Sequence, residues 1–328
     1  MATKTSPELE LNLALYRKLY LIRKSEQKII EYYPENEMKT PMHMSMGQEF
    51  VSVGVCMALN GRGDIFASYR SHAAFLAQTA DTDRFFGELY GRTNGIADGK
   101  GGSMHLAAPE CGHILSSGVV ASAIPAAVGA GYANERFNND RTAAVFFGDG
   151  ALDAGVFWEC INTASLFRLP ILFVCEDNGF AVHTPRTERH AFNDVCEVVR
   201  KFKCAVYEDV SNDVESVYRL TLEATANARA DRRPAFLNIK CYRYLEHVGI
   251  NEDWMIGYRN KSELEFWLSR DSLKIQRERL LSSGLTEVQV VESESEIDRA
   301  IQLSVRNAAV APAPTSELLY EGVFYAAH

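Results

Sequence analysis

The sequence contains no run of about eighteen apolar residues, so it offers no segment that could cross a membrane as a helix. It has no block of clustered Lys and Arg, and its formal net charge of -9 argues against nucleic acid as a partner. The first residues form neither the apolar core of a secretion signal nor a long transit segment rich in Arg and Ser. We therefore expect a cytoplasmic protein with no membrane and no nucleic acid among its partners.

The sequence also lacks closely spaced pairs of cysteines. The seven cysteines are odd in number, scattered, and include no Cys-x-x-Cys. This favours buried free thiols in a reducing compartment, and core packing is the expected role of Cys175. The chain has 328 residues and is 47% hydrophobic, which is enough for a large core in one or two domains.

Two motifs follow apolar runs in the middle of the chain. Residues 148–150 read Gly-Asp-Gly after the apolar run 142–147, and residues 177–178 read Asp-Asn after the run 171–175. The segment between them has apolar side chains at helical spacing, namely Val156, Ile161, Ala164 and Phe167. This order predicts a strand, a tight turn, a helix and a second strand.

In a parallel sheet, both motifs would lie at the carboxyl ends of their strands. There an acidic side chain and an amide could bind one Mg²⁺, while the glycines let the backbone approach a diphosphate closely. Gly-Asp-Gly on its own is more often a surface turn. The second motif, and the strand expected before each of the two, favour the metal site.

Together the motifs resemble the thiamine-diphosphate signature, in which Gly-Asp-Gly is followed by Asn-Asn. Further segments resemble those of 2-oxo acid dehydrogenase alpha subunits, in the same order: residues 67–72 (Ala-Ser-Tyr-Arg-Ser-His), 99–105 (Gly-Lys-Gly-Gly-Ser-Met-His), 117–120 (Ser-Gly-Val-Val), 158–162 (Trp-Glu-Cys-Ile-Asn), 242–244 (Tyr-Arg-Tyr) and 258–259 (Tyr-Arg). The chain is therefore similar to the alpha subunit of a heteromeric thiamine-diphosphate 2-oxo acid dehydrogenase of the pyruvate, branched-chain or acetoin type.

This resemblance implies an α/β fold in which a mostly parallel sheet is flanked by helices. It implies a thiamine-diphosphate-binding domain over residues 1–260 and a helical C-terminal extension over residues 261–328, packed on the same domain. The implied activity is oxidative decarboxylation of a 2-oxo acid with acyl transfer to a lipoyl group on an acyltransferase. The carboxylate that activates the cofactor lies on the beta subunit in this family, so we expect an α₂β₂ assembly and a structural role for Glu159.

The resemblance also assigns the metal ligands. The side chains of Asp149 and Asn178 and the backbone carbonyl of Phe180 would bind Mg²⁺, for which such oxygen ligands are suited. Asp177 departs from the family, because it stands where the first Asn of the signature is found. The metal ligands themselves are intact, so the departure affects the local hydrogen bonds.

Six residues are implied to contact the cofactor. Tyr69 and Arg70 resemble residues near the diphosphate, and an Arg fork suits phosphate oxygens. The alternative for Arg70 is a surface ion pair. Backbone groups would come from Gly118 and Val120 for the aminopyrimidine, and from Gly150 and Ala151 for the diphosphate.

Two histidines carry the implied catalytic roles. His247 would donate a proton to the lipoyl sulfur and His72 would help to hold the site, and a pKa near neutrality suits histidine for such work. The alternative for each is an ordinary surface or core histidine.

The late loop departs from the family, because residues 245–248 read Leu-Glu-His-Val and lack the usual Gly before the histidine and Ser after it. We expect no control by phosphorylation at position 248. The altered loop leaves open a thiamine-dependent acyloin carboligase, and a non-catalytic cofactor-binding subunit is the third alternative.

Helices are expected at both ends of the chain. Thr5 or Ser6 should cap a first helix that runs to about Tyr32. Other helices are expected over residues 49–59, 121–133, 263–281 and 294–310. Glycines crowd residues 91–102, which predicts an ordered but irregular loop.

Overall fold

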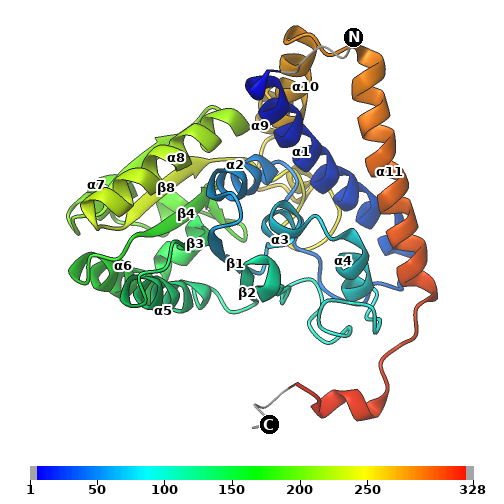
Figure 1. The fold of residues 1–328 in the computed structure, drawn as a ribbon, viewed down its shortest axis with the longest axis horizontal. Helices are drawn as coiled ribbons and strands as arrows, with labels where there is room; N and C mark the ends of the chain where they lie inside the picture. The colour runs from blue at the N-terminus through cyan, green and yellow to red at the C-terminus, as the bar shows by residue number, and fades with distance from the viewer. Residues whose placement is uncertain (1–5, 323–328) are drawn as a thin grey trace.

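The computed structural model describes residues 6–322, and a six-stranded sheet forms its centre (Figure 1). The strand order is β2-β1-β3-β4-β8-β7, and all neighbouring strands are parallel. The strands are β1 (Gly63–Ser68), β2 (His113–Ser117), β3 (Thr142–Gly148), β4 (Ile171–Asp177), β7 (Ala205–Asp209) and β8 (Ala235–Lys240). The predicted α/β class and the parallel sheet are confirmed.

Helices cover both faces of the sheet. One face packs against α2 (Glu49–Leu59), α3 (His72–Thr79) and α8 (Val214–Asp231), and the other against α5 (Ala123–Arg136), α6 (Gly155–Leu166) and α7 (Val195–Arg200). Alternate residues of β3 enter the two cores: Phe146 the first, Val145 and Phe147 the second. Strand β4 is buried along its whole length, as expected for a strand covered on both faces.

The helix predicted between the two motifs is confirmed as α6, but its buried face differs from the apolar positions that indicated it. Ile161 and Ala164 are buried as predicted, but the other core positions are Phe157 and Cys160. Phe167 lies just beyond the helix and is 56% exposed. The helix begins only after a 3-10 turn, at Gly155, and residues 157, 160, 161 and 164 then share one helical face.

The two ends of the chain pack together. Helix α1 (Pro7–Tyr32) contacts α10 (Ser272–Ser282) and α11 (Glu287–Val310), and α11 also packs on α4 (Thr82–Leu89). Ser6 caps α1 by accepting a hydrogen bond from the Leu9 N–H at 3.2 Å, whereas Thr5 lies outside the described residues. The proposed division at residue 260 stays a prediction.

The predicted helix over residues 263–281 is two helices, α9 (Lys261–Ser269) and α10. Asp271 separates them, because its carboxylate caps α10 by accepting from the N–H groups of Leu273 and Lys274. The other carboxylate oxygen of Asp271 accepts from Arg23 at 2.8 Å, so a contact with α1 fixes the break.

The glycine-rich loop after α4 is ordered around one buried carboxylate. Oε2 of Glu88 accepts from the N–H groups of Ala97 at 2.8 Å and Gly99 at 3.0 Å. Oε1 accepts from Gly101 at 2.7 Å and Gly102 at 2.8 Å. Since a carboxylate can accept four such bonds, Glu88 holds the loop in place without regular secondary structure, as predicted for residues 91–102.

The remaining elements are short. They are the hairpin strands β5 (Phe180–Ala181) and β6 (Thr184–Pro185) and the 3-10 helices η1 (Tyr33–Glu35), η2 (Pro109–Cys111), η3 (Asp149–Asp153), η4 (Arg186–Glu188), η5 (Asp253–Ile256) and η6 (Ser316–Tyr320). All seven cysteines are free, and every one except Cys111 is buried, as predicted. Within residues 6–322, none of the helices has both the length and the hydrophobicity needed to span a bilayer.

Candidate functional site

A pocket lies at the carboxyl edge of the sheet, where the segments after β1, β3, β4 and β8 meet. This is the edge at which open parallel sheets bind ligands. Most of the predicted site residues line it: Tyr69, Arg70, Val120, Gly150, Ala151, Asn178, Phe180 and His247. The fold therefore brings together segments that are separated by up to 178 positions between Tyr69 and His247.

Asp149 and Gly118 lie close to the pocket but are not among the residues that line it. Asp149 is fully buried between Gly148 and Gly150, both of which face the pocket. Gly118 precedes Val120 in the loop after β2, and its Cα faces the ring of His105. A Cβ at position 118 would lie 3.2 Å from Nε2 of that ring, so the close approach favours glycine.

His72 lies away from the pocket, in a fully buried hydrogen-bond chain. Its Nδ1 is 3.0 Å from Oε1 of Glu26 on α1, and its Nε2 is 2.7 Å from Oγ of Ser103 in the glycine-rich loop. The chain links α1, α3 and that loop. This position is suited to supporting the site, and a direct contact of His72 with a pocket ligand is not available.

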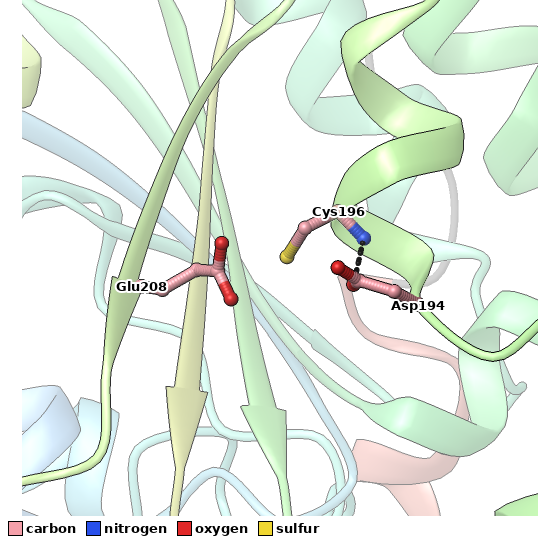
Figure 2. Close-up of side chains that lie close together, drawn as sticks. All are labelled: Asp194, Cys196 and Glu208. Atoms are coloured by element: carbon pink, nitrogen blue, oxygen red, sulfur yellow. Dashed lines mark hydrogen bonds between the residues drawn. The ribbon is translucent and has the colours of Figure 1, made fainter.

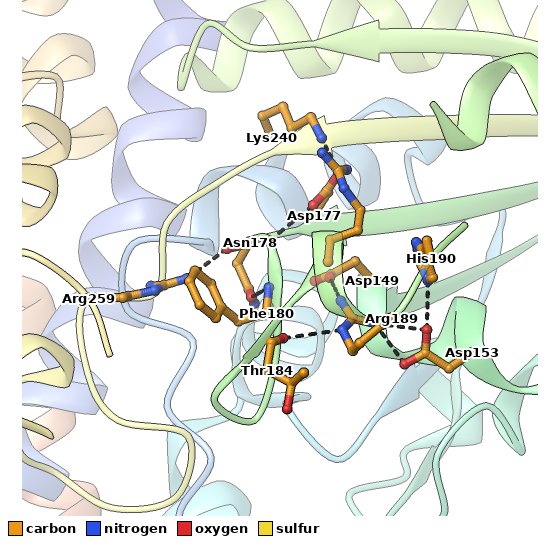
Figure 3. A network of polar contacts seen from close by, with 12 residues as sticks. Asp149, Asp153, Asp177, Asn178, Phe180, Thr184, Arg189, His190, Lys240 and Arg259 are labelled. Carbon is orange, nitrogen blue, oxygen red and sulfur yellow. Dashed lines mark hydrogen bonds and ion pairs between the residues drawn. The ribbon is translucent and has the colours of Figure 1, made fainter. Parts of the chain in front are cut away.

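The predicted metal ligands lie in two segments, with Asp149 directly after β3 and Asn178 and Phe180 after the neighbouring strand β4 (Figure 3). Oδ1 of Asp149 is buried and has no hydrogen-bond partner, while Oδ2 accepts from Arg189. Asn178 Oδ1 accepts from the Phe180 N–H at 3.2 Å, and its Nδ2 donates to Oε1 of Gln48 at 3.0 Å. Burial, with the nearby charge of Asp177, raises the pKa of Asp149, so a cation beside this carboxylate would stabilise its ionised form.

Asp177 is charge-compensated. Its buried carboxylate forms ion pairs with Arg186 at 2.6 Å and with Lys240, and it accepts from the Gly179 N–H at 3.1 Å (Figure 3). An amide at this position would need neither cation. The two cations explain how an acidic residue is tolerated beside Asn178.

His247 lines the pocket and lies between two arginines. Its Nδ1 is 3.2 Å from Nη1 of Arg243 and 3.4 Å from Nη2 of Arg70. Burial and the positive charges of Arg70 and Arg243 lower the pKa of His247 to about 3. The imidazole is therefore neutral in this environment at physiological pH.

Comparison with known proteins identifies the family. The model of the dehydrogenase E1 component matches residues 17–317. The chain belongs to the dehydrogenase E1 component family. The E1 component subunit alpha of pyruvate dehydrogenase from Zymomonas mobilis subsp. mobilis is 30% identical over 95% of this chain and 88% of that relative. The corresponding Rhizobium meliloti subunit is 30% identical over 96% of this chain and 90% of its own length.

A third relative has a different name. The alpha subunit of acetoin:2,6-dichlorophenolindophenol oxidoreductase from Bacillus subtilis is 29% identical over 90% of this chain and 89% of its own length. The predicted similarity to 2-oxo acid dehydrogenase alpha subunits, and with it the enzyme class, is confirmed. Membership of the E1 family implies thiamine diphosphate as the cofactor.

Two residues of this E1 site were missed by the sequence reasoning. His43 packs against Tyr69 and His247, with ring centroids 4.5 and 5.4 Å apart, and burial lowers its pKa to about 3. Glu176 lines the pocket between Gln48 and Arg70, and burial raises its pKa to about 8. The signal for Glu176 was its place directly before the Asp-Asn motif. His43 gave only a weak signal, shortly before the Gly-Gln-Glu segment.

A second group of possible metal ligands, none of which lines this pocket, consists of Asp194, Cys196 and Glu208 (Figure 2). Asp194 caps α7 by accepting from the Cys196 N–H at 2.8 Å, and Glu208 pairs with Arg200 at 2.7 Å. Burial, with the charge of Glu208 adding to it, raises the pKa of Cys196 to about 12. The thiol stays protonated, so a helix cap and an ion pair account for the group.

Proposed function

We propose that this chain is the alpha subunit of an α₂β₂ 2-oxo acid dehydrogenase that uses thiamine diphosphate and Mg²⁺. The proposed reaction is oxidative decarboxylation of a 2-oxo acid, with transfer of the acyl group to the lipoyl group of an acyltransferase. The observation that carries the proposal is the pocket at the carboxyl edge of the sheet, where Asn178, Arg70 and His247 meet beside the buried Asp149.

The residues fit the metal. A buried carboxylate oxygen without a partner is costly, and Oδ1 of Asp149 is such an oxygen. Mg²⁺ takes carboxylate, amide and backbone oxygens and keeps phosphate oxygens as further ligands. Asp149, Asn178 and the carbonyl of Phe180 would supply the protein's share. Arg189 pairs with Oδ2 of Asp149, which leaves Oδ1 as the carboxylate oxygen available to a metal.

Thiamine diphosphate, when bound, supplies the electron sink that lets a 2-oxo acid lose CO₂. The chain itself would bind and orient. Backbone groups of Gly150 and Ala151 line the pocket after β3 and suit a diphosphate. Both terminal nitrogens of Arg70 donate to carbonyls, to Met44 at 2.7 Å and to His247 at 3.1 Å. Arg70 would therefore contribute positive charge to the site and hold the late loop in place. It would not bind a phosphate through both terminal nitrogens, because both already donate to carbonyls.

The proposed beta subunit would complete the site. Among the described residues that line the pocket, Glu176 is the only carboxyl group, and it lies beside Gln48, which binds Asn178 at the metal end. Glu159 is exposed on α6 and does not line the pocket. The carboxylate that activates the aminopyrimidine would therefore come from another chain.

Exposed apolar side chains near the pocket support such a partner. Val120 and Val182 line the pocket and are half-exposed, and Val119 beside them is 67% exposed. Val248 and Met255 on the late loop are also exposed. A group of exposed apolar side chains beside a binding site is typical of a surface that another protein covers.

The substrate is tested by co-expression of this chain with its beta partner and measurement of CO₂ release. The assay would contain thiamine diphosphate, Mg²⁺, an artificial electron acceptor and a panel of 2-oxo acids, with acetoin as a further substrate because of the Bacillus relative. Turnover with one 2-oxo acid, followed by acylation of a lipoyl domain, would support the proposal. Acyloin formation without lipoyl would favour a carboligase. Cofactor binding without any turnover would favour a non-catalytic subunit.

A further inference from the structure

The contacts of His247 fix which ring nitrogen carries its proton. Nδ1 faces Nη1 of Arg243 at 3.2 Å and Nη2 of Arg70 at 3.4 Å. A guanidinium group has only N–H donors and keeps its charge in proteins. Nδ1 must therefore accept in both contacts, so the proton of the neutral imidazole lies on Nε2.

Arg243 is held independently of the histidine. The side chain is 1% exposed, and its Nε donates to the carbonyl of Leu245 at 2.9 Å. Its Nη2 contacts the two carboxylate oxygens of Asp253 at 3.2 and 3.1 Å and the hydroxyl of Tyr258 at 2.5 Å. With these bonds made, Nη1 is left pointing at His247, and the guanidinium acts as a rigid support for the ring.

The other groups that face His247 do not favour its protonation. Arg70 adds a second positive charge, and the rings of His43 and Tyr69 lie with centroids 5.4 and 5.7 Å away. His183 also lowers the proton affinity of His247. The neighbouring carboxylate of Glu246 accepts from the backbone and side chain of Asn251. The ring therefore lies among cationic and neutral groups.

We propose that Arg243 is a positioning residue that, with Arg70, keeps His247 neutral with its proton on Nε2, so that His247 serves the reaction as a hydrogen-bond donor. This deepens the proposed function and rests on it, because His247 matters only if the pocket holds the reacting groups. A neutral imidazole N–H can stabilise negative charge that develops on a carbonyl oxygen. The proposal replaces the transfer of a proton to sulfur, which would require an imidazolium.

The low pKa of His247, about 3, agrees with this arrangement. A charge this close to a titrating group shifts its pKa by about one unit or more. Since one unit is a tenfold change in protonation, removal of the Arg243 charge should raise the proton affinity of the ring by about tenfold or more. Arg259 provides a matched control. It is also buried and pairs with Asp253 at 3.1 Å, but its hydrogen bonds go to the backbone carbonyls of Arg243 and Asn178 and not to the ring of His247.

The experiment is nitrogen NMR of the full chain labelled with ¹⁵N in the histidine rings, titrated from about pH 8 down to about pH 3.5. H247N assigns the signal. The wild-type signal should be that of a neutral ring protonated on Nε2 at every pH above about 5. R243M should titrate at higher pH than wild type, R243K should restore part of the wild-type behaviour, and R259M should leave the signal unchanged.

Three results would overturn the proposal. They are a proton on Nδ1, an imidazolium in the wild type at pH near neutrality, and equal changes in R243M and R259M. If R243M does not fold, the wild-type spectrum still decides the tautomer and the charge. The measurement needs neither cofactor nor 2-oxo acid, so its outcome is separate from any failure to detect decarboxylation.

Discussion

The cluster around Asp177 allows a quantitative prediction. The Asp177 side chain is 1% exposed, whereas Arg186 and Lys240 keep 30% and 31% exposure. Loss of both cations would leave a buried carboxylate without a countercharge. Breaking a buried pair in this way costs about 3–5 kcal/mol. We expect that loss of stability for the double variant R186M/K240M.

Removal of the Asp177 charge, with both cations kept, should lower the stability only slightly. D177N leaves two cations that water can reach, and the Asn oxygen can still accept from Gly179, so we expect a loss of about 1 kcal/mol. In the triple variant D177N/R186M/K240M, no buried charge is left uncompensated. Its stability should return to within about 1–2 kcal/mol of wild type, because an amide needs hydrogen bonds but no countercharge.

Urea unfolding followed by circular dichroism measures these differences, with the four proteins compared at one pH and one protein concentration. The decisive quantity is the coupling between the loss of the charge at position 177 and the loss of the two cations. If the triple variant is as unstable as R186M/K240M, or if the costs simply add, the two cations do not serve Asp177 and the compensation argument fails.

Three further predictions concern other parts of the molecule. The variant E88Q removes the charge from a buried side chain that accepts four N–H bonds, and it turns an NH₂ group toward two of those donors. The loss of two charge-assisted hydrogen bonds should lower the free energy of unfolding in urea by about 3–6 kcal/mol. The control variant E110Q, at the surface, should lower it by almost nothing. Burial lowers the pKa of His113 to about 3, so between about pH 6.5 and pH 3 the unfolded chain takes up a proton that the folded chain does not. His113 should therefore lower the stability by up to about 1.4 kcal/mol per pH unit as pH drops through this range, in addition to the similar effects of His43 and His247; H113Q should remove the share of His113, and an unchanged slope would contradict the assignment. D149N should weaken Mg²⁺-dependent binding of thiamine diphosphate by roughly 100-fold in calorimetry of the assembled enzyme, and equal binding would exclude Asp149 as a ligand.

The sequence predicted the fold where local signals agree. Helix α2 has the predicted bounds, because apolar side chains run through residues 49–59 and Asn60-Gly61 ends the helix in the left-handed region. The break between α9 and α10 was not predictable in the same way. It depends on the contact of Asp271 with Arg23, which lies 248 positions earlier in the chain. The exposure of Phe167 was missed because the start of α6 was unknown.

The pocket was predictable to the extent that its residues follow strands. Asp149 and Asn178 come directly after β3 and β4, which are neighbours in the sheet, so topology alone brings them close. The support of His247 is different. Arg243 and Arg70 reach its ring through the path of the late loop, which no periodicity describes.

The packing of α1 against α10 and α11 affects the order in which this protein can fold during synthesis. Tyr16 donates to Glu294 at 2.5 Å, and Gln276 donates to the carbonyl of Asn12 at 3.0 Å. These partners are 278 and 264 positions apart, so the first helix leaves the ribosome long before its partners are made. Helix α1 also packs on α2 and α3, which follow it within the first 80 residues, so only the part of its surface that meets α10 and α11 must wait for the end of synthesis. The α1 surface that meets α10 and α11 can therefore be completed only when synthesis is nearly finished.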